Sequence, residues 1–365
     1  MKQPPKRLLY GPGPSMVEPS VYEAMSQPVV GHLDPYFFSV VDEVRSGLRQ
    51  VFGTANPMTL AISGTGSSGM ETAVANFVEP GTKVAILANG FFCDRITEMA
   101  KRHGGEVVRL EKPWGEVFGD QEAAEFLRRE RPKVAAYVQA ETSTGAYNQG
   151  KAICDAARDV DALVIADAVT SLGAMPVKAD ETGIDIAYSC TQKGLSCPPG
   201  LSPITVSPRA MERLEERKRP VGTWYLDLKL LKDYYDGRKY HHTASASLFY
   251  ALRESLDLIA QEGLEKRWER HRRNHLALVA GFESMGMKML VCEGHRLWNL
   301  NTPLLPPGVD DAAIRRQLLE QYGIEVSGGF GPLAGKILRV GLMGPLATEE
   351  GTASLLAALR TAMGR

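Results

Sequence analysis

Short apolar runs alternate with longer amphipathic segments along the first 206 residues of the chain. Residues 162–166 are five consecutive apolar residues, the pattern of a strand buried on both faces. In residues 121–129 the apolar positions are spaced three and four apart, as on one face of a helix. The strands predicted in this way are residues 59–63, 83–88, 106–110, 133–139, 162–166, 185–190 and 203–206, and the helices between them are residues 69–78, 95–102, 121–129, 151–158 and 209–217. This alternation predicts an α/β fold with a mostly parallel sheet of seven strands, covered by helices on both faces.

The order of the predicted elements changes after Val206, where an aromatic and basic stretch is followed by helices at residues 246–261 and 267–285. The remaining predicted elements are strands at 297–305 and 337–341 and helices at 311–322 and 348–363. That order indicates a second, smaller α+β domain. We therefore expect an extended arm over residues 1–20, where Gly11-Pro-Gly-Pro14 disfavours regular structure, a large domain over residues 21–262 and a small C-terminal domain over residues 263–365.

Composition narrows the classes of function. The 42 basic and 43 acidic residues give a net charge of −1, which argues against a nucleic-acid-binding protein because such proteins need a basic excess. With 44% hydrophobic and 23% charged residues, the chain is typical of a globular protein rather than a disordered one. No apolar run reaches the roughly 20 residues of a membrane-spanning helix, so we expect no membrane insertion.

The cysteines and the chain ends bear on compartment and metal binding. Five cysteines are scattered without a C-x-x-C pair, which predicts neither a disulfide framework nor a zinc site. The adjacent His241 and His242 also predict no metal site, because neighbours on an extended strand point to opposite faces. The basic N-terminus lacks an apolar region behind it, and the C-terminal tripeptide is no sorting signal, so we expect a cytoplasmic enzyme.

A glycine-rich turn joins a predicted strand to a predicted helix. Its sequence, Gly64-Thr-Gly66-Ser-Ser-Gly69, has the spacing at which backbone N–H groups and a helix N-terminus hold a phosphate. One interpretation is a dehydrogenase that binds NAD. Two features weaken it: the next strand ends in Asn89-Gly90 instead of an acidic residue that would bind the ribose, and the hydroxyl side chains suit a terminal phosphate. Taken alone, the motif fits a ligand-free turn equally well.

An aspartate and a lysine follow two of the later strands. Asp167 ends a buried strand, and Lys193 comes 26 residues later, after the next strand. Ligands bind at the carboxyl ends of such strands. Pyridoxal phosphate enzymes need a lysine for a Schiff base, a carboxylate that keeps the pyridine nitrogen protonated, and a phosphate cradle. The glycine turn supplies the third element, so this combination favours pyridoxal phosphate over NAD.

The sequence resembles the class V aminotransferases, in particular the alanine–glyoxylate and serine–pyruvate (serine–glyoxylate) aminotransferase group, which has the fold-type I architecture of pyridoxal-phosphate-dependent transferases. The resemblance extends from Leu8-Leu-Tyr-Gly-Pro-Gly-Pro14 to Leu338-Arg-Val-Gly-Leu-Met-Gly344. The motifs that carry it are Ser63-Gly-Thr-Gly-Ser-Ser-Gly-Met-Glu71, Glu141-Thr-Ser-Thr-Gly145, Asp167-Ala-Val-Thr-Ser171, Thr191-Gln-Lys193, Tyr240-His-His-Thr243 and Gly331-Pro-Leu-Ala-Gly-Lys336.

The resemblance implies a role for each matching residue. Lys193 would form the Schiff base, and Asp167 would pair with the pyridinium nitrogen. The phosphate would be held by Thr65, Gly66, Ser67 and Gln192, while Thr142 would lie near the ring oxygen and Val169 beneath the ring. Phe92 stands where the family commonly has a tryptophan, so the apolar face remains but the indole N–H is lost. Tyr240 and Thr243 would reach the phosphate of the neighbouring subunit, which implies a homodimer with composite sites.

The expected reaction is transamination between a small amino acid and glyoxylate or pyruvate, in ping-pong order. Arg339, in a short apolar strand, would hold the substrate carboxylate, a role that the resemblance implies and that suits the planar fork of a guanidinium. L-Alanine or L-serine is the expected donor. An alternative is (S)-ureidoglycine–glyoxylate transamination, whose members have Asn and Gln at the places of Tyr240 and His32. A cysteine desulfurase is less favoured, since Cys190 and Cys197 lie too close to Lys193 to move freely.

Overall fold

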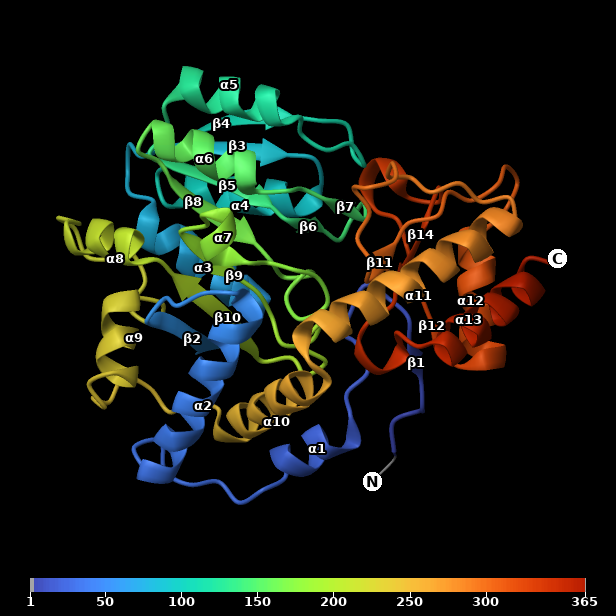
Figure 1. The fold of residues 1–365 in the computed structure, drawn as a ribbon, viewed down its shortest axis with the longest axis horizontal. Coiled ribbons are helices and arrows are strands. Elements are labelled where there is room, and N and C mark those ends of the chain that lie inside the picture. The colour runs from blue at the N-terminus through green and yellow to red at the C-terminus, as the bar shows by residue number, and fades with distance from the viewer. Residues whose placement is uncertain (1–2, 365) are drawn as a thin grey trace.

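The structure is a computed structural model in which residues 3–364 are described. A seven-stranded sheet forms the centre of the larger part of the molecule (Figure 1), with the strand order β2-β10-β9-β8-β5-β3-β4. Strand β10 is antiparallel to both of its neighbours, and the other pairs are parallel. The structure confirms the predicted α/β fold, and each predicted strand is present: β2 (Met58–Ser63), β3 (Lys83–Ala88), β4 (Glu106–Glu111), β5 (Val134–Val138), β8 (Leu163–Asp167), β9 (Ile186–Tyr188) and β10 (Leu201–Val206).

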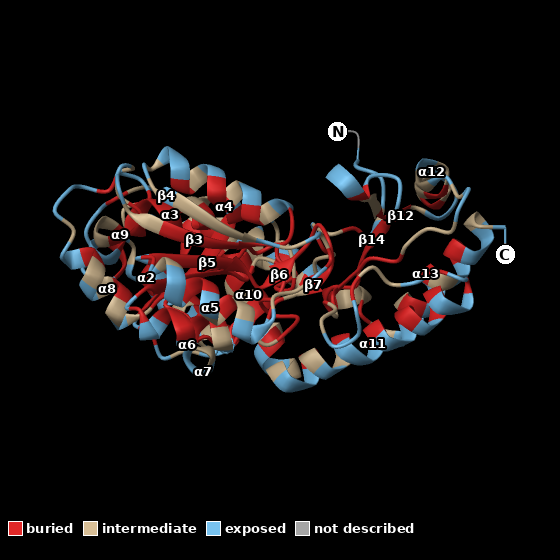
Figure 2. Cartoon of the chain, turned by 90° about the horizontal axis from the view of Figure 1, so that it is seen from above, coloured by how far each residue is buried: buried red, intermediate tan, exposed pale blue. Residues whose placement is uncertain are grey.

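Helices cover both faces of this sheet. Figure 2 shows α3 and α4 on one face and α5, α6 and α7 on the other, with the buried strands between them. Strand β5 is buried at every position, which explains its continuous apolar sequence. The helices of this part are α2 (Pro35–Phe52), α3 (Gly66–Phe77), α4 (Phe91–Arg102), α5 (Asp120–Glu130), α6 (Lys151–Asp159), α7 (Ala179–Thr182), α8 (Pro208–Glu215), α9 (Leu228–Tyr235) and α10 (Ala246–Glu262).

A second hydrophobic core lies in the C-terminal part of the chain, between α11 (Leu264–Ser284), α12 (Asp311–Tyr322) and α13 (Glu349–Ala362) and a small antiparallel sheet. The strand order of that sheet is β11-β14-β13, and its central strand carries Arg339. The remaining short elements are β6 (Ala140–Glu141), β7 (Ala146–Tyr147), β11 (Leu300–Asn301), β12 (Ile324–Glu325), β13 (Ser327–Gly328), β14 (Leu338–Gly341), η1 (Gly331–Leu333) and η2 (Gly344–Leu346).

The N-terminal segment differs from the expected arm without regular structure. Strand β1 (Leu8–Leu9) pairs in parallel with β12, and α1 (Pro19–Met25) begins before residue 20. Tyr10 is buried in the C-terminal core, where its carbonyl accepts a hydrogen bond from the Gly341 N–H at 2.7 Å. The expectation failed because residues 6–10 contain no proline or glycine and are free to pair and pack, and because Pro19 is compatible with the first turn of a helix.

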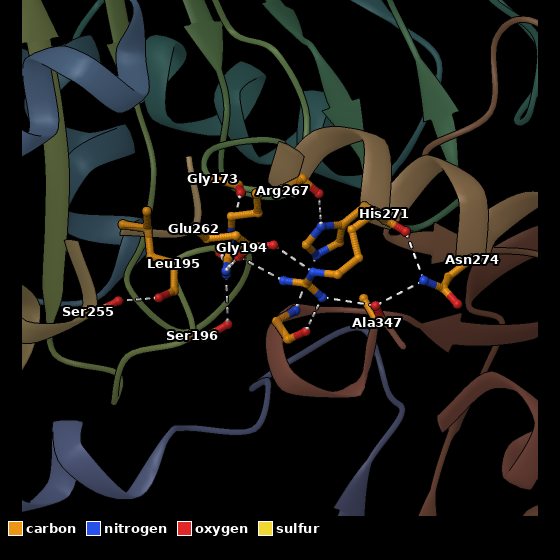
Figure 3. Close-up of polar contacts among 12 residues, drawn as sticks. Gly173, Gly194, Leu195, Ser196, Ser255, Glu262, Arg267, His271, Asn274 and Ala347 are labelled. Carbon is orange, nitrogen blue, oxygen red and sulfur yellow. Dashed lines mark hydrogen bonds and ion pairs between the residues drawn. The ribbon is translucent and has the colours of Figure 1, made fainter. Parts of the chain in front are cut away.

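Helix α11 connects the two parts of the molecule, and its buried polar side chains contact both (Figure 3). The Arg267 guanidinium donates to the carbonyls of Gly173 and Gly194, each at 2.9 Å, and pairs with Glu262 at 2.8 Å. One turn later Arg270 pairs with the same carboxylate and donates to the carbonyls of Gly344 and Ala347. Gly194 directly follows Lys193, so α11 holds the lysine loop and the segment after β14 together.

Within residues 3–364, we found no helix with both the length and the apolar character needed to cross a membrane.

Candidate active site

The carboxyl ends of the central strands surround a cavity of about 140 Å³. Parallel strands end at one edge of the sheet, so the loops that follow β2, β8 and β9 meet there. Nine of the residues singled out from the sequence line this cavity: Thr65, Gly66, Ser67, Phe92, Thr142, Asp167, Val169, Gln192 and Lys193. Met70, Arg95 and Cys190 complete the lining.

Asp167 lies buried at the end of β8. Its carboxylate accepts hydrogen bonds from the Val169 N–H at 2.9 Å and from the Tyr188 hydroxyl at 2.8 Å. Burial raises the pKa of Asp167 to about 6, against the effect of these two donors. Tyr188 was not predicted as a site residue, although it is the β9 residue paired with Asp167 in the sheet.

Lys193 is held from two directions. Its Nζ donates to the Pro12 carbonyl, and its own carbonyl accepts from the Ser15 hydroxyl at 2.8 Å. Burial lowers the pKa of the Lys193 ammonium, and the positive charge of Arg339 lowers it further. The contribution of Pro12 and Ser15 was not predicted, because the family resemblance over residues 8–14 assigned no role to Pro12 and does not include Ser15.

The glycine turn forms the N-terminus of α3, and the backbone N–H groups at the start of a helix favour an anionic ligand. A Cβ atom on Gly66 would lie 2.9 Å from the Cys190 Cβ, so close packing requires glycine here. The Ser67 hydroxyl accepts from Arg95 Nη1 at 3.3 Å. Gln192 Oε1 is buried and has no hydrogen-bond partner among the described residues. The Ser67 hydroxyl, the Arg95 guanidinium and the start of α3 thus lie together in the lining of the cavity.

Glu141 is a buried carboxylate beside Phe92 that the sequence analysis did not single out as a site residue. It accepts from the Phe92 N–H at 3.1 Å and from the Ser143 N–H and hydroxyl at 2.9 and 2.6 Å. Burial raises the pKa of Glu141 to about 7. Because Phe92 is in the first turn of α4, Glu141 fixes the position at which that ring enters the cavity.

Arg339 lies on β14 with only 7% of its surface exposed. Its Nε donates to the Gly328 carbonyl at 2.8 Å, and its guanidinium lies 3.8 Å from the centre of the Phe330 ring. No hydrogen bond or ion pair engages its two Nη atoms within the described part of the chain. Burial lowers the pKa of Arg339 to about 10, which still leaves it charged at neutral pH.

Tyr240 and Thr243 do not join the cavity of their own chain. Tyr240 is 63% exposed, Thr243 is exposed as well, and neither residue lines the cavity. The expectation that His241 and His242 point to opposite faces is wrong. Their Nδ1 atoms lie 2.8 Å apart because this segment is not a strand. In residues 3–364 no group of three or more His, Cys, Asp or Glu side chains is arranged to hold a metal ion.

The cavity therefore combines a lysine, a buried carboxylate and the N-terminus of a helix. Residues 8–343 match the family model described as aminotransferase class-V. The chain belongs to the class V aminotransferases. This membership decides against the dehydrogenase that binds NAD, and class V aminotransferases use pyridoxal 5'-phosphate. The residues present fit that cofactor: the start of α3 and the hydroxyls of Thr65 and Ser67 suit its phosphate, and the buried Asp167 suits a cationic ring nitrogen.

Several aminotransferases are similar to this chain over almost its whole length. The alanine–glyoxylate aminotransferase from Nostoc sp. shares 48% identity and a TM-score of 0.98, covering 99% of this chain and 96% of the other. The ureidoglycine–glyoxylate aminotransferase from Bacillus subtilis shares 40% identity and a TM-score of 0.97, covering 100% and 94%. The alanine–glyoxylate aminotransferase of Drosophila melanogaster is 38% identical over 98% of this chain and 93% of its own length.

Proposed function

We propose that this enzyme transfers the amino group of a small amino acid, L-alanine or L-serine, to glyoxylate or pyruvate. The observation that carries the proposal is the position of Arg339. Arg339 lies against the Phe330 ring, which contacts Phe91, and Phe91 contacts Phe92 of the cavity that Lys193 also lines. A donor whose carboxylate is held by Arg339 presents its Cα to Lys193 Nζ.

Each group of the cavity has a separate task in this proposal. Bound pyridoxal phosphate supplies a ring that accepts electrons from the substrate carbon. Lys193 Nζ would hold the cofactor and afterwards move a proton to and from the substrate Cα, for which a lowered pKa is favourable. Asp167 would keep the ring nitrogen protonated. Thr65, Gly66, Ser67 and Gln192 would hold the phosphate, with Phe92 and Val169 on the two faces of the ring and Thr142 at its edge.

The direct test is a donor and acceptor assay with the purified enzyme. L-Alanine or L-serine with glyoxylate should yield glycine and the corresponding keto acid, and borohydride treatment of the enzyme should leave a pyridoxyl group on Lys193 in a peptide map. Lys193→Ala should lack both the turnover and the labelled peptide. A complete lack of turnover with alanine, serine and ureidoglycine would contradict the proposal.

(S)-Ureidoglycine remains the second candidate donor, supported by the similarity to the Bacillus subtilis enzyme. Tyr240 and His32 stand where we expect Asn and Gln in that branch, and their rings lie 5.0 Å apart. An aromatic pair offers fewer hydrogen-bonding groups for a ureido group than two amide side chains. The kcat/KM for ureidoglycine should therefore be below that for alanine, and the reverse ratio would favour the second candidate.

We also propose a homodimer whose sites are composite, with Tyr240 and Thr243 reaching the phosphate in the partner's cavity. Their exposure in the single chain supports this proposal. Lys193→Ala and Tyr240→Ala chains should each be inactive. Mixed after reversible dissociation, they should recover about one quarter of native activity, because half of the dimers then contain one intact site. No recovery in a verified mixed dimer would contradict composite sites. The free cysteines support a cytoplasmic location, which fractionation would test.

A further inference from the structure

A continuous stack of two guanidinium groups and three aromatic rings runs along the site. Arg339 lies 3.8 Å from the Phe330 ring centre, and Phe330 meets Phe91 edge to face at 5.2 Å. Phe91 meets Phe92 in the same way at 5.5 Å, and the Arg95 guanidinium lies 5.0 Å from the Phe92 ring. Phe92 and Arg95 line the cavity, whereas Phe330 and Arg339 come from the C-terminal part of the chain. The stack thus joins the cavity to the arginine that would bind the carboxylate.

The backbone around Phe330 holds its ring in one place. β13 and β14 form an antiparallel pair in which Ser327 faces Arg339 and Gly328 faces Leu338. The Gly329 N–H donates to the Ile337 carbonyl at 3.2 Å, and the Phe330 carbonyl accepts from the Leu333 N–H at 3.0 Å. These two hydrogen bonds hold the backbone on both sides of Phe330.

Two contacts restrict the Arg339 side chain without using the atoms that bind a carboxylate. The Gly328 carbonyl engages Nε, and the Phe330 ring covers one face of the guanidinium plane. A guanidinium binds a carboxylate through two parallel N–H groups, so its plane must be oriented before the substrate arrives. An aromatic face attracts and aligns such a cation, and an aliphatic side chain of similar size lacks this electrostatic attraction.

We propose that Phe330 is a positioning residue that orients Arg339 for the α-carboxylate of the amino acid and the keto acid, and that Phe91 braces the Phe330 ring. The inference rests on the proposed function only in assigning Arg339 to a carboxylate. Both substrates of a transamination carry that carboxylate. Loss of the Phe330 ring should therefore weaken the binding of the amino donor and of the keto-acid acceptor by the same factor.

The test compares Phe330→Leu, Phe330→Met and Phe330→Tyr with the native holoenzyme. Leu and Met should raise the KM of both L-alanine and glyoxylate about ten-fold, with kcat and the Kd of pyridoxal phosphate changed less than about two-fold. Tyr keeps the ring and should restore native KM values. Phe126→Leu is the matched control: it removes the ring beside another arginine, Arg129, on α5 at 5.5 Å. That control should lower thermal stability without changing either KM.

A second comparison tests whether Phe330 affects substrate binding through Arg339 or by contacting the substrate itself. Phe330→Leu in an Arg339→Gln background should change kcat/KM by less than two-fold, because the arginine that Phe330 orients is gone. An unchanged KM in both Phe330→Leu and Phe330→Met, or a ten-fold loss that persists in the Arg339→Gln background, would overturn the proposal. Protection against thermal unfolding by propionate, which has a carboxylate but no amino group, should weaken in parallel. That measurement gives an answer even if neither alanine nor serine is the donor.

Discussion

Arg267→Met is expected to destabilise the enzyme much more than the same change at Arg273, although both arginines lie on α11. The Arg267 side chain is buried between the two parts of the molecule, where it contacts two backbone carbonyls and Glu262 (Figure 3). Arg273 is 62% exposed and pairs with Glu349 at a distance of 3.5 Å. The pair of variants therefore compares a buried with an exposed ionic contact on one helix.

The size of the expected loss of stability follows from the groups that lose Arg267 as a partner. Removal of one member of a buried ion pair typically costs about 3–5 kcal/mol. Here the carbonyls of Gly173 and Gly194 also lose a donor, while Glu262 keeps its contact with Arg270. We expect a loss of about 4 kcal/mol. For a 365-residue chain the unfolding entropy is about 0.8 kcal/mol per kelvin, so the melting temperature should fall by about 5 °C.

Differential scanning calorimetry of the two variants and the native enzyme measures this difference. Arg273→Met should shift the melting temperature by less than about 1 °C, since exposed ion pairs contribute about 0–1 kcal/mol. Equal shifts in the two variants would refute the reasoning, because they would show that burial of the Arg267 contacts adds nothing. A shift below about 1 °C for Arg267→Met would do the same.

Three further changes test other parts of the structure. Burial and the neighbouring Arg267 charge lower the pKa of His271 to about 3, so its neutral form contributes stability above pH 6.5 that is lost on acidification. The free energy of unfolding should fall by roughly 2 kcal/mol between pH 6.5 and 5. His271→Gln should remove this part of the pH dependence in urea titrations. Gly66→Ala places a methyl group against Cys190 and should weaken pyridoxal phosphate binding about ten-fold in a spectral titration. The control Gly119→Ala, whose added Cβ has no atom outside the adjacent residues nearer than 4.0 Å, should leave the affinity unchanged. Equal affinities of the two variants would argue against the tight turn at Gly66. Asp310→Ala removes the side chain that caps α12 and should cost about 1 kcal/mol in chemical denaturation, with most of the loss recovered by Asp310→Asn.

Hydrophobic patterning was sufficient for most of the central sheet because its strands, apart from the edge strand β4, are buried on both faces. Such strands must be continuously apolar, and their ends are marked by the first polar residue, as at Asp167. Lys193 could be anticipated for the same reason, because it follows the neighbouring strand in the chain. The shared edge of a parallel sheet then predicts that both residues lie in one cavity. The pattern of the N-terminal segment was weaker, and the pairing of β1 with β12 was missed.

Glu141, Arg95, Tyr188 and Phe330 entered the site only through the tertiary structure. Glu141 meets Phe92 across 49 residues of sequence, and Phe330 meets Phe91 from the C-terminal part of the chain. Neither contact leaves a local signal, because an aromatic ring or a buried glutamate fits many positions equally well. The sequence by itself determined the order of elements and the reactive groups at the strand ends, since each depends on neighbouring residues. Only packing between distant segments decided how those groups are oriented, because orientation depends on contacts that the folded chain creates.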